Sequence, residues 1–182
     1  EEDGAVGVID VDSGKQKAQI PVGKEPEGIL VSRDGKTVYA TSEVASLVHV
    51  IDTATNKVVK NIKVGKRPRR FAMTPDGSQL WVTNELASSV TIIDVKTLAV
   101  ADTIKFEIKG ARASDITPVG IVMNAAGTRA FVGLGKANHV AFIDVPARKV
   151  THLVLVGKRA WNVTLDKAEA RLYVVNGLSD DM

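Results

Sequence analysis

The sequence predicts an all-β chain built from repeated four-stranded antiparallel blades, and three observations predict it. A five-residue segment ending in Asp recurs at spacings of 42, 42 and 50 residues, with its aspartates at Asp10, Asp52, Asp94 and Asp144. A second set of landmarks keeps offsets of 42, 50 and 42 residues, beginning at Tyr39, Trp81, Phe131 and Tyr173. No segment shows the apolar period of an amphipathic helix. A period near 42 with four short β-rich segments is typical of a β-propeller blade.

The strands of one repeat can be placed in order along residues 65–105. Strand A is expected at 71–74, strand B at 79–83, strand C at 90–94 and strand D at 99–104. Pro75-Asp76-Gly77 predicts a tight turn between A and B, because Asp offers the backbone an acceptor and Gly tolerates positive φ. The repeated Asp that ends strand C is expected to accept hydrogen bonds from amides of the C-to-D turn, which is a structural role.

The repeats divide a single propeller domain, or a fragment of one, into five parts. These are a half blade at 1–21, blades at 22–63, 64–105 and 106–155, and a half blade at 156–182. The strands therefore number two, four, four, four and two, and the chain begins and ends within a blade. Propellers close rings of roughly four to eight blades. The chain could close on four blades, but we expect about four repeat equivalents of a larger ring, whose open edges would favour self-association.

The third complete blade is longer than the others. The 50-residue spacing exceeds the 42-residue period by 8 residues, and the landmarks place this insertion between Ile104 and Pro118. An insertion there makes a lid or a contact, with Arg112 and Asp115 as its polar tips, or it is merely an extended D strand with a long turn.

Composition excludes several classes of site and partner. The chain has 182 residues with 24 basic and 21 acidic ones, giving a net charge of +3, and the charges are interspersed, so nucleic acid is not indicated. There is no Cys, which excludes disulfides, thiolate metal sites and a cysteine nucleophile. No apolar stretch approaches the roughly 18 residues of a transmembrane helix. The chain opens on Glu1-Glu2-Asp3 without Met or a signal peptide, so we expect a mature protein or a fragment.

The blade phrases carry a family resemblance. Trp81-Val82-Thr83-Asn84 and Tyr173-Val174-Val175-Asn176, with the neighbouring Val-Ile-Asp and Pro-Asp-Gly phrases, resemble the YVTN-repeat β-propellers over essentially the whole chain. Within that family the chain looks most like the bacterial propellers associated with PQQ-dependent alcohol catabolism, on the segments 64–69, 106–108 and 156–162. The Thr-Asn pair is absent from Phe131-Val132-Gly133-Leu134, so we interpret the pair as structural.

The resemblance implies a location and a context. It implies a periplasmic protein, usually of about seven blades in this family, that works alongside a quinoprotein dehydrogenase. The family provides no established catalytic residues that could be assigned to positions of this sequence.

The candidate site lies where the D-to-A and B-to-C loops share one face of the propeller, beside the A strands that line its channel. The basic side chains there could converge on a small anionic ligand or an acidic partner, or they could be solvated loop charges paired with Glu27, Glu43 and Glu85. Trp161 offers a stacking surface or is a packed aromatic. The candidate binding residues are Arg67, Arg69, Arg70, Glu85, Arg112, Lys158, Arg159 and Trp161.

No cofactor, metal site or catalytic residue is predicted. The three histidines, His49, His139 and His152, are expected in strand C, at the start of strand C and in strand D of different blades, which is no metal-ligand spacing. Phosphate-binding glycine loops and hydrolase motifs are also absent from the sequence.

Three functions compete at this point. The first is a non-enzymatic periplasmic binding or scaffold propeller, whose partner is a periplasmic dehydrogenase, another protein or a small anionic ligand. The second is a lactonase-like hydrolase, since related propellers include lactone hydrolases, and Glu27, Arg69 and Glu85 are the nearest available set. The third is a cell-surface interaction propeller, for which the sequence carries no specific mark.

Overall fold

The structure is a computed structural model that describes residues 4–179 and 182. Over these residues the chain forms sixteen strands in five antiparallel sheets, together with two short 3-10 helices, η1 (Glu85–Ala87) and η2 (Ala113–Asp115). Residues 1–3 of the predicted first half blade and residues 180–181 of the predicted last half blade lie outside the described residues. No helix among those described is long and apolar enough to span a membrane.

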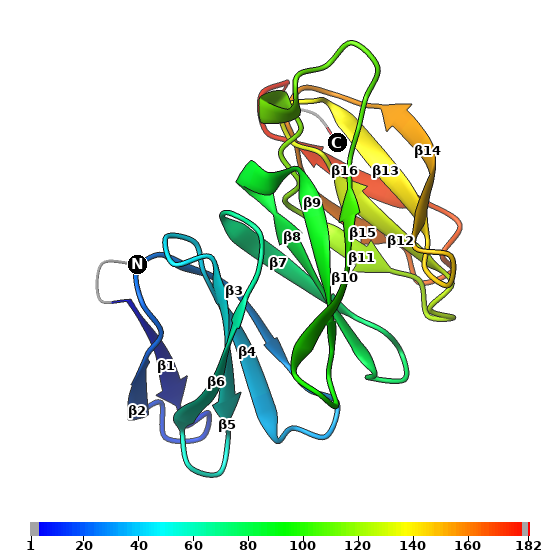
Figure 1. Cartoon of the computed structure of the whole chain (residues 1–182). Coiled ribbons are helices and arrows are strands. Elements are labelled where there is room, and N and C mark those ends of the chain that lie inside the picture. The colour runs from blue at the N-terminus through cyan, green and yellow to red at the C-terminus, as the bar shows by residue number, and fades with distance from the viewer. Residues whose placement is uncertain (1–3, 180–181) are drawn as a thin grey trace.

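Three sheets are complete blades and two are half blades (Figure 1). The first half blade pairs β1 (Ala5–Ile9) with β2 (Gln16–Pro21), and the last pairs β15 (Ala160–Leu165) with β16 (Leu172–Asn176). The first complete blade consists of β3 (Pro26–Val31), β4 (Thr37–Ser42), β5 (Leu47–Asp52) and β6 (Lys57–Lys63). The second consists of β7 (Pro68–Met73), β8 (Gln79–Asn84), β9 (Ser89–Asp94) and β10 (Ala99–Lys105). The third consists of β11 (Ile121–Met123), β12 (Arg129–Gly133), β13 (His139–Asp144) and β14 (Lys149–Leu155). The propeller architecture predicted from the repeats is confirmed.

The start of one strand differs from the prediction by three residues, while the other predicted bounds in residues 65–105 agree to within one residue. Strand β7 begins at Pro68, three residues before the expected start at Phe71, and its register with β8 shifts between these two residues. Strand β3 has the same irregularity between Pro26 and Ile29. A bulge breaks the alternation of apolar and polar side chains along a strand. The apolar alternation therefore begins only after the bulge, and it does not predict the first residues of the strand.

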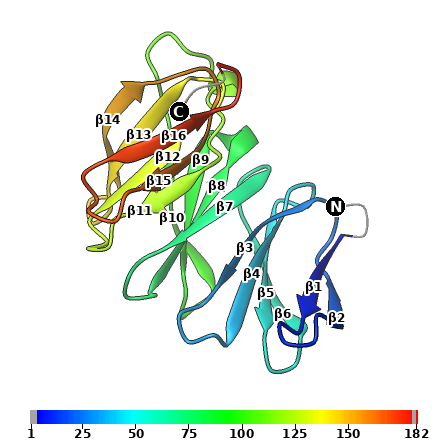
Figure 2. The ribbon, with the colours of Figure 1, turned by 180° about the vertical axis from the view of Figure 1, so that it is seen from behind.

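The sheets follow one another in chain order, and the first strands of successive blades are neighbours. Strand β3 contacts β7, β7 contacts β11, and β11 contacts β15. Seen from behind, the array runs from the half blade at the N-terminus to the half blade at the C-terminus, with the marked ends far apart (Figure 2). The core lies between the sheets. The second strand of each complete blade packs one aromatic residue against the following blade; these residues are Tyr39, Trp81 and Phe131.

The Thr of the Thr-Asn pair joins neighbouring blades. The Thr83 hydroxyl accepts a hydrogen bond from the Arg70 amide (3.0 Å) and donates one to the carbonyl of Val119 in the next blade (2.7 Å). Thr41 makes the equivalent bonds with Gly28 and Arg69. In the blade that has Gly133 instead, the amide of Gly120 donates directly to the Trp161 carbonyl at 3.0 Å. This Thr therefore has a structural role, because its hydroxyl hydrogen-bonds one blade to the next.

The insertion is a packed loop and not an extended D strand. Strand β10 has 7 residues, the same as β6, so the additional residues lie after it. Phe106 and Ile116, at the two sides of the insertion, are buried in the core between β7–β10 and β11–β14. The Ser88 hydroxyl also donates to the Ala113 carbonyl at 2.6 Å.

Candidate functional site

The D-to-A loops are held in one conformation by a repeated backbone feature. Glu25, Arg67 and Arg159 occupy equivalent repeat positions, and all three have left-handed backbone angles, with φ of 53°, 55° and 62°. The carbonyl of each accepts a hydrogen bond from the B-to-C loop of its own blade; for Arg67 the donor is the Glu85 amide at 2.9 Å. Non-glycine residues in this region are uncommon and often lie at functional sites. The loops therefore hold three charged side chains on one face.

Arg69, on β7, is the centre of an ion-pair network. Its side chain is only 7% exposed, and it donates a short hydrogen bond to Glu43. Its guanidinium also lies 3.7 Å from Glu27 and 3.5 Å from Glu85. Burial of a charge is costly unless it is paired, so these contacts are needed to hold Arg69 in place.

Two half-exposed arginines complete the network at its rim. Arg67 donates to Glu43 at 2.6 Å and lies 3.3 Å from Glu85, and the hydrogen bond to Glu43 is the main reason that the pKa of Arg67 is raised. Arg70 pairs with Glu27 at 3.1 Å and donates to the Glu27 carbonyl at 3.3 Å. The network thus joins the β3–β6 blade to the β7–β10 blade.

Trp161 links this network to the last half blade. The guanidinium carbon of Arg69 lies 5.0 Å from the centre of the Trp161 ring, and that of Arg159 lies 4.8 Å from it, both within cation–π range. Because β7 and β15 belong to sheets separated by the β11–β14 blade, the contact between Arg69 and Trp161 spans the inner end of that intervening blade.

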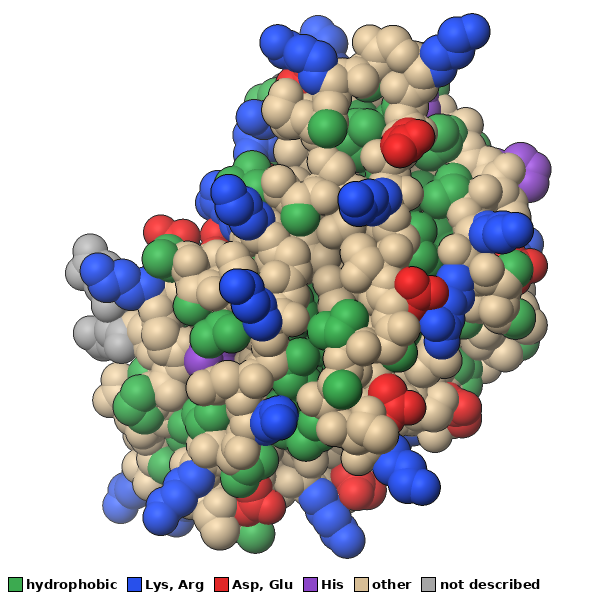
Figure 3. Space-filling view, in the orientation of Figure 1, with side chains coloured by type: hydrophobic (Ala, Val, Ile, Leu, Met, Phe, Trp, Pro, Cys, Tyr) green, Lys and Arg blue, Asp and Glu red, His purple; other side chains and the backbone are tan. Residues whose placement is uncertain are grey.

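A cavity of about 360 Å³ opens at the centre of this arrangement. Its lining carries three carboxylates and two guanidinium groups around one indole ring, from Glu25, Pro26, Glu27, Glu43, Arg67, Arg69 and Trp161. Each of these arginines contacts a carboxylate. The lining therefore has one more carboxylate than guanidinium groups, which differs from the basic surface that could attract an anion. Basic and acidic side chains are also interspersed over the face of the molecule in Figure 3.

The structure brings most of the predicted site residues together. Arg67, Arg69, Arg70 and Glu85 form the network, while Trp161 and Arg159 join it through stacking. Arg112 and Lys158 lie outside it. Arg112 has an 83% exposed side chain whose carboxylate partner is Asp115, at 2.9 Å, and that carboxylate raises the pKa of Arg112.

The sequence did not identify Glu25 as a candidate site residue, and it did not predict that Trp161 would contact Arg69. Glu25 lines the cavity at the repeat position of Arg67, so comparison of the repeats could have found it. The approach of Trp161 to Arg69 had no signal in the sequence, because it depends on how far the blades rotate about the channel.

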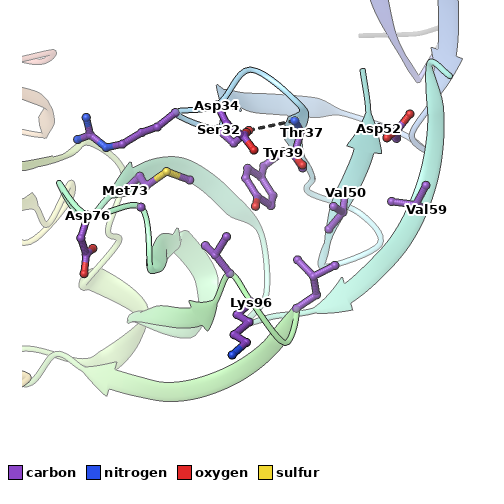
Figure 4. A pocket seen from close by; sticks show the side chains of 14 residues that line it. Ser32, Asp34, Thr37, Tyr39, Val50, Asp52, Val59, Met73, Asp76 and Lys96 are labelled. Carbon is purple, nitrogen blue, oxygen red and sulfur yellow. Dashed lines mark hydrogen bonds between the residues drawn. The ribbon is translucent and has the colours of Figure 1, made fainter. Parts of the chain in front are cut away.

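A second cavity, of about 390 Å³, lies between the β3–β6 and β7–β10 blades at the opposite ends of the strands (Figure 4). Tyr39 points into it, and burial is the main cause of the raised pKa of Tyr39. Its carboxylates serve the turns: Asp34 accepts from the Ser32 hydroxyl at 2.6 Å, and Asp76 accepts from the Thr74 hydroxyl at 2.6 Å. This cavity is therefore a weaker candidate than the Arg69 network.

The repeated aspartates are turn residues, as expected. Asp52 accepts from the backbone amide and the hydroxyl of Thr55, each at 2.7 Å, and Asp94 does the same with Thr97. These hydrogen bonds lower the pKa of both aspartates.

The histidines lie on the strands that were predicted for them and do not gather. His49 is buried on β5 with Nδ1 2.7 Å from the Asn61 amide oxygen, while its Nε2 has no hydrogen-bond partner in the described part of the chain. Within the same residues no group of three or more His, Asp or Glu side chains is arranged to hold a metal ion.

Fold and strand topology define this chain as a β-propeller protein. Residues 3–74 match the model of the YNCE-like β-propeller family. No curated protein sequence matches the chain.

Solved structures show the same fold at low sequence identity. A chain of hydrazine synthase from Kuenenia stuttgartiensis is 18% identical, with a TM-score of 0.61 and coverage of 99% of this chain and 76% of that one. A provisionally assigned 6-phosphogluconolactonase from Bacteroides uniformis is 13% identical, with a TM-score of 0.77 and coverage of 94% and 57%. The β-propeller domain of Cps50 (Swd1) from Myceliophteria thermophila is 14% identical, with a TM-score of 0.75 and coverage of 96% and 57%. The chain thus spans little more than half of the last two.

Proposed function

We propose that this chain is a binding or scaffold propeller that works in the periplasm beside a quinoprotein alcohol-oxidising system and catalyses no reaction itself. The periplasmic and quinoprotein context rests on the resemblance of its blade phrases. The binding role rests on one observation, the network around Arg69. The network joins two blades by ion pairs and reaches a third through Trp161, and it leaves half-exposed charges at the rim of a cavity.

The buried part of the network supports recognition more than catalysis. A general base must be able to take a proton from a substrate, whereas Glu27, Glu43 and Glu85 all lie within ion-pair distance of arginines. Fixed charges in a defined geometry give an interface its specificity and steer its partner. Lys158 and Arg159, on the D-to-A loop before β15, form no ion pair with a carboxylate among the residues that the structure describes, so they can pair with an acidic surface of another protein.

A binding measurement with the cognate quinoprotein alcohol dehydrogenase tests this proposal. We expect saturable binding that weakens with salt, and a roughly tenfold higher Kd for the double variant Lys158→Gln with Arg159→Gln, since tenfold corresponds to about 1.4 kcal/mol. The control is Lys57→Gln with Lys60→Gln on the outer strand β6, which removes the same number of exposed charges from another face. No binding at low or high salt, or equal losses in both variants, would count against the proposal.

A lactonase-like function is the second candidate, because one observation favours it. Glu27 and Glu85 flank the same guanidinium, that of Arg69, and a provisionally assigned lactonase is among the similar folds. Hydrolysis of gluconolactone and 6-phosphogluconolactone can be followed by acid release. We expect no rate above that of buffer. A rate that Glu85→Gln abolishes, while the variant keeps its far-ultraviolet circular dichroism, would replace the binding proposal by this one.

A further inference from the structure

The cavity between the β3–β6 and β7–β10 blades contains a hydroxyl group that no other part of the chain binds. Tyr39, on β4, is 1% exposed, and its ring points into this cavity of about 390 Å³ (Figure 4). No hydrogen bond to the Tyr39 hydroxyl is found in the part of the chain that the structure describes. Polar groups of buried side chains nearly always have a hydrogen-bond partner. The Tyr39 hydroxyl is therefore free to bind a ligand in the cavity.

In the next blade the chain itself fills the equivalent space. Trp81 holds the repeat position of Tyr39 and is 0% exposed, and its indole nitrogen donates to the Gln79 side chain at 3.1 Å. Thr37 replaces Gln79 in the β3–β6 blade and lines the cavity together with Tyr39. The hollow beside Gln79, between the β7–β10 and β11–β14 blades, does not reach Trp81. The smaller pair of side chains thus leaves space open beside Tyr39.

The outer rim of the cavity lacks a contact that closes the next pair of blades. Between the β7–β10 and β11–β14 blades, Arg148 donates to Asp102 at 3.0 Å. The repeat equivalents of these two residues at the cavity are Leu98 and Lys60, which cannot form an ion pair. Leu98 and Val59, which is 59% exposed, line the cavity instead. The cavity therefore reaches the surface of the molecule at this edge.

The inner lining of the cavity is apolar. Val50, Met73, Val95 and Leu98 line it, and all four belong to the same hydrophobic cluster as Tyr39. Sites for small molecules are typically hollows of about 300–1,000 Å³ with mostly apolar walls and a few polar groups that orient the ligand. This lining therefore suits a ligand with an apolar body.

The charged groups of the lining leave Tyr39 as the group that orients such a ligand. Asp34, Asp52 and Asp76 all accept hydrogen bonds from their own turns. In Figure 4, Asp52, Asp76 and Lys96 lie at the outside of the group of side chains, and Tyr39 lies at its centre. Burial raises the pKa of Tyr39, and the charge of Asp34 adds to this effect, so the hydroxyl is protonated at neutral pH and can donate a hydrogen bond.

We propose that this cavity binds a small uncharged molecule with an aromatic or alicyclic body and a carbonyl or ether oxygen that accepts a hydrogen bond from the Tyr39 hydroxyl. The apolar body lies against Val50, Val95 and Leu98. The site is at the opposite ends of the strands from the Arg69 network and involves none of its residues. It therefore does not depend on the partner proposed for that network.

Methyl nuclear magnetic resonance of the full chain tests the site, with acetophenone as the probe. The chain has three methionines, Met73, Met123 and Met182, so labelled methionine methyl groups give few signals. Met73 lines the cavity, whereas Met123 holds the same repeat position one blade later and does not line it. We expect acetophenone to shift the Met73 signal saturably, with a Kd in the millimolar range for so small a molecule, and to leave the Met123 signal in place.

The variant Tyr39→Phe tests the hydrogen bond. It keeps the ring and removes the hydroxyl, so we expect it to raise the Kd of acetophenone about threefold or more, as the loss of one neutral hydrogen bond implies. The matched probe is α-methylstyrene, in which a CH₂ group replaces the carbonyl oxygen. Its Kd should be the same for Tyr39→Phe and for the unmodified chain.

A second variant tests the position of the probe. Thr37→Gln with Tyr39→Trp copies the side chains of the next blade into the cavity, so neither probe should then shift the Met73 signal. The control Arg129→Gln with Phe131→Trp places the same pair in the β11–β14 blade and should leave binding unchanged. Circular dichroism verifies that each variant folds, and if the filled variant does not, Tyr39→Phe decides alone.

Three results would overturn the proposal. The first is a Met73 signal that does not move up to the solubility limit of acetophenone. The second is an equal shift of the Met73 and Met123 signals, which would mean that the probe binds without preference for this cavity. The third is an acetophenone Kd that Tyr39→Phe leaves unchanged.

Discussion

Single charged side chains decide how the candidate site is held together, and Arg69 is the most constrained of them. We expect Arg69→Met to lower the free energy of unfolding by about 3–5 kcal/mol, because it leaves Glu43 and Glu85 buried without their central cation. Urea unfolding measures this loss. Adding Glu43→Gln to the variant should recover at least about 1 kcal/mol, since it removes one of the two buried carboxylates that then share Arg67 as their cation. A loss below about 1 kcal/mol in the single variant would mean that the network is solvated.

The aspartates of the turns make stability depend on acid pH. Asp76 accepts hydrogen bonds from the Thr74 hydroxyl and from the amide and hydroxyl of Ser78, and these lower its pKa from 3.8 to about 2. A carboxyl group whose pKa is lower in the folded state stabilises the fold above its unfolded pKa and loses that effect as pH falls toward the folded value. Asp76 therefore contributes fully above about pH 4, and the contribution disappears between 3.8 and about 2.

We expect Asp76→Asn to flatten the fall of the urea midpoint between pH 4 and pH 2. The control is Asp12→Asn, because Asp12 is exposed and no hydrogen bond to its carboxylate is found in the described part of the chain. If the two variants had the same pH dependence, the turn of Asp76 would not be the source of the effect.

At the scale of the strand, the packing of one blade on the next requires the backbones of their first strands to lie close together. A Cβ atom on Gly28, in β3, would lie 2.0 Å from the carbonyl oxygen of Arg69 in the next blade, so β3 and β7 could not keep their spacing. We expect Gly28→Ala to destabilise the fold by about 1–3 kcal/mol, the usual cost of overpacking. Gly7→Ala, on β1, meets no atom within 4 Å and should be neutral or slightly stabilising in thermal unfolding. Equal effects would contradict the packing argument.

The strands could be predicted well from the repeats because each blade repeats the same apolar alternation and the same turn residues. Strand order, the roles of Asp52 and Asp94, and the positions of the three histidines all follow from apolar alternation and turn chemistry. The start of β7 and the contact between Trp161 and Arg69 could not be predicted. The first depends on a bulge, and the second on the rotation between blades, and neither leaves a periodic trace in the sequence.

At the scale of the whole molecule, burial is unequal along the array. The β7–β10 blade lies between two complete blades, and Leu80, Trp81 and Val82 on its β8 strand are 0% exposed. The half blades at the two ends have one neighbouring blade each, and β16 leaves Tyr173 and Val175 38% and 48% exposed. In repeat architectures stability is approximately a sum of unit terms and neighbour interfaces, so the end units have fewer favourable terms.

We therefore expect a gradient of amide hydrogen exchange. Amides of β8 and β9 should exchange only through global unfolding, whereas those of β2 and β16 should exchange faster by local opening. Mass spectrometry of exchange in dilute protein measures this order. Exchange at equal rates in all five sheets would mean that the array unfolds as one unit.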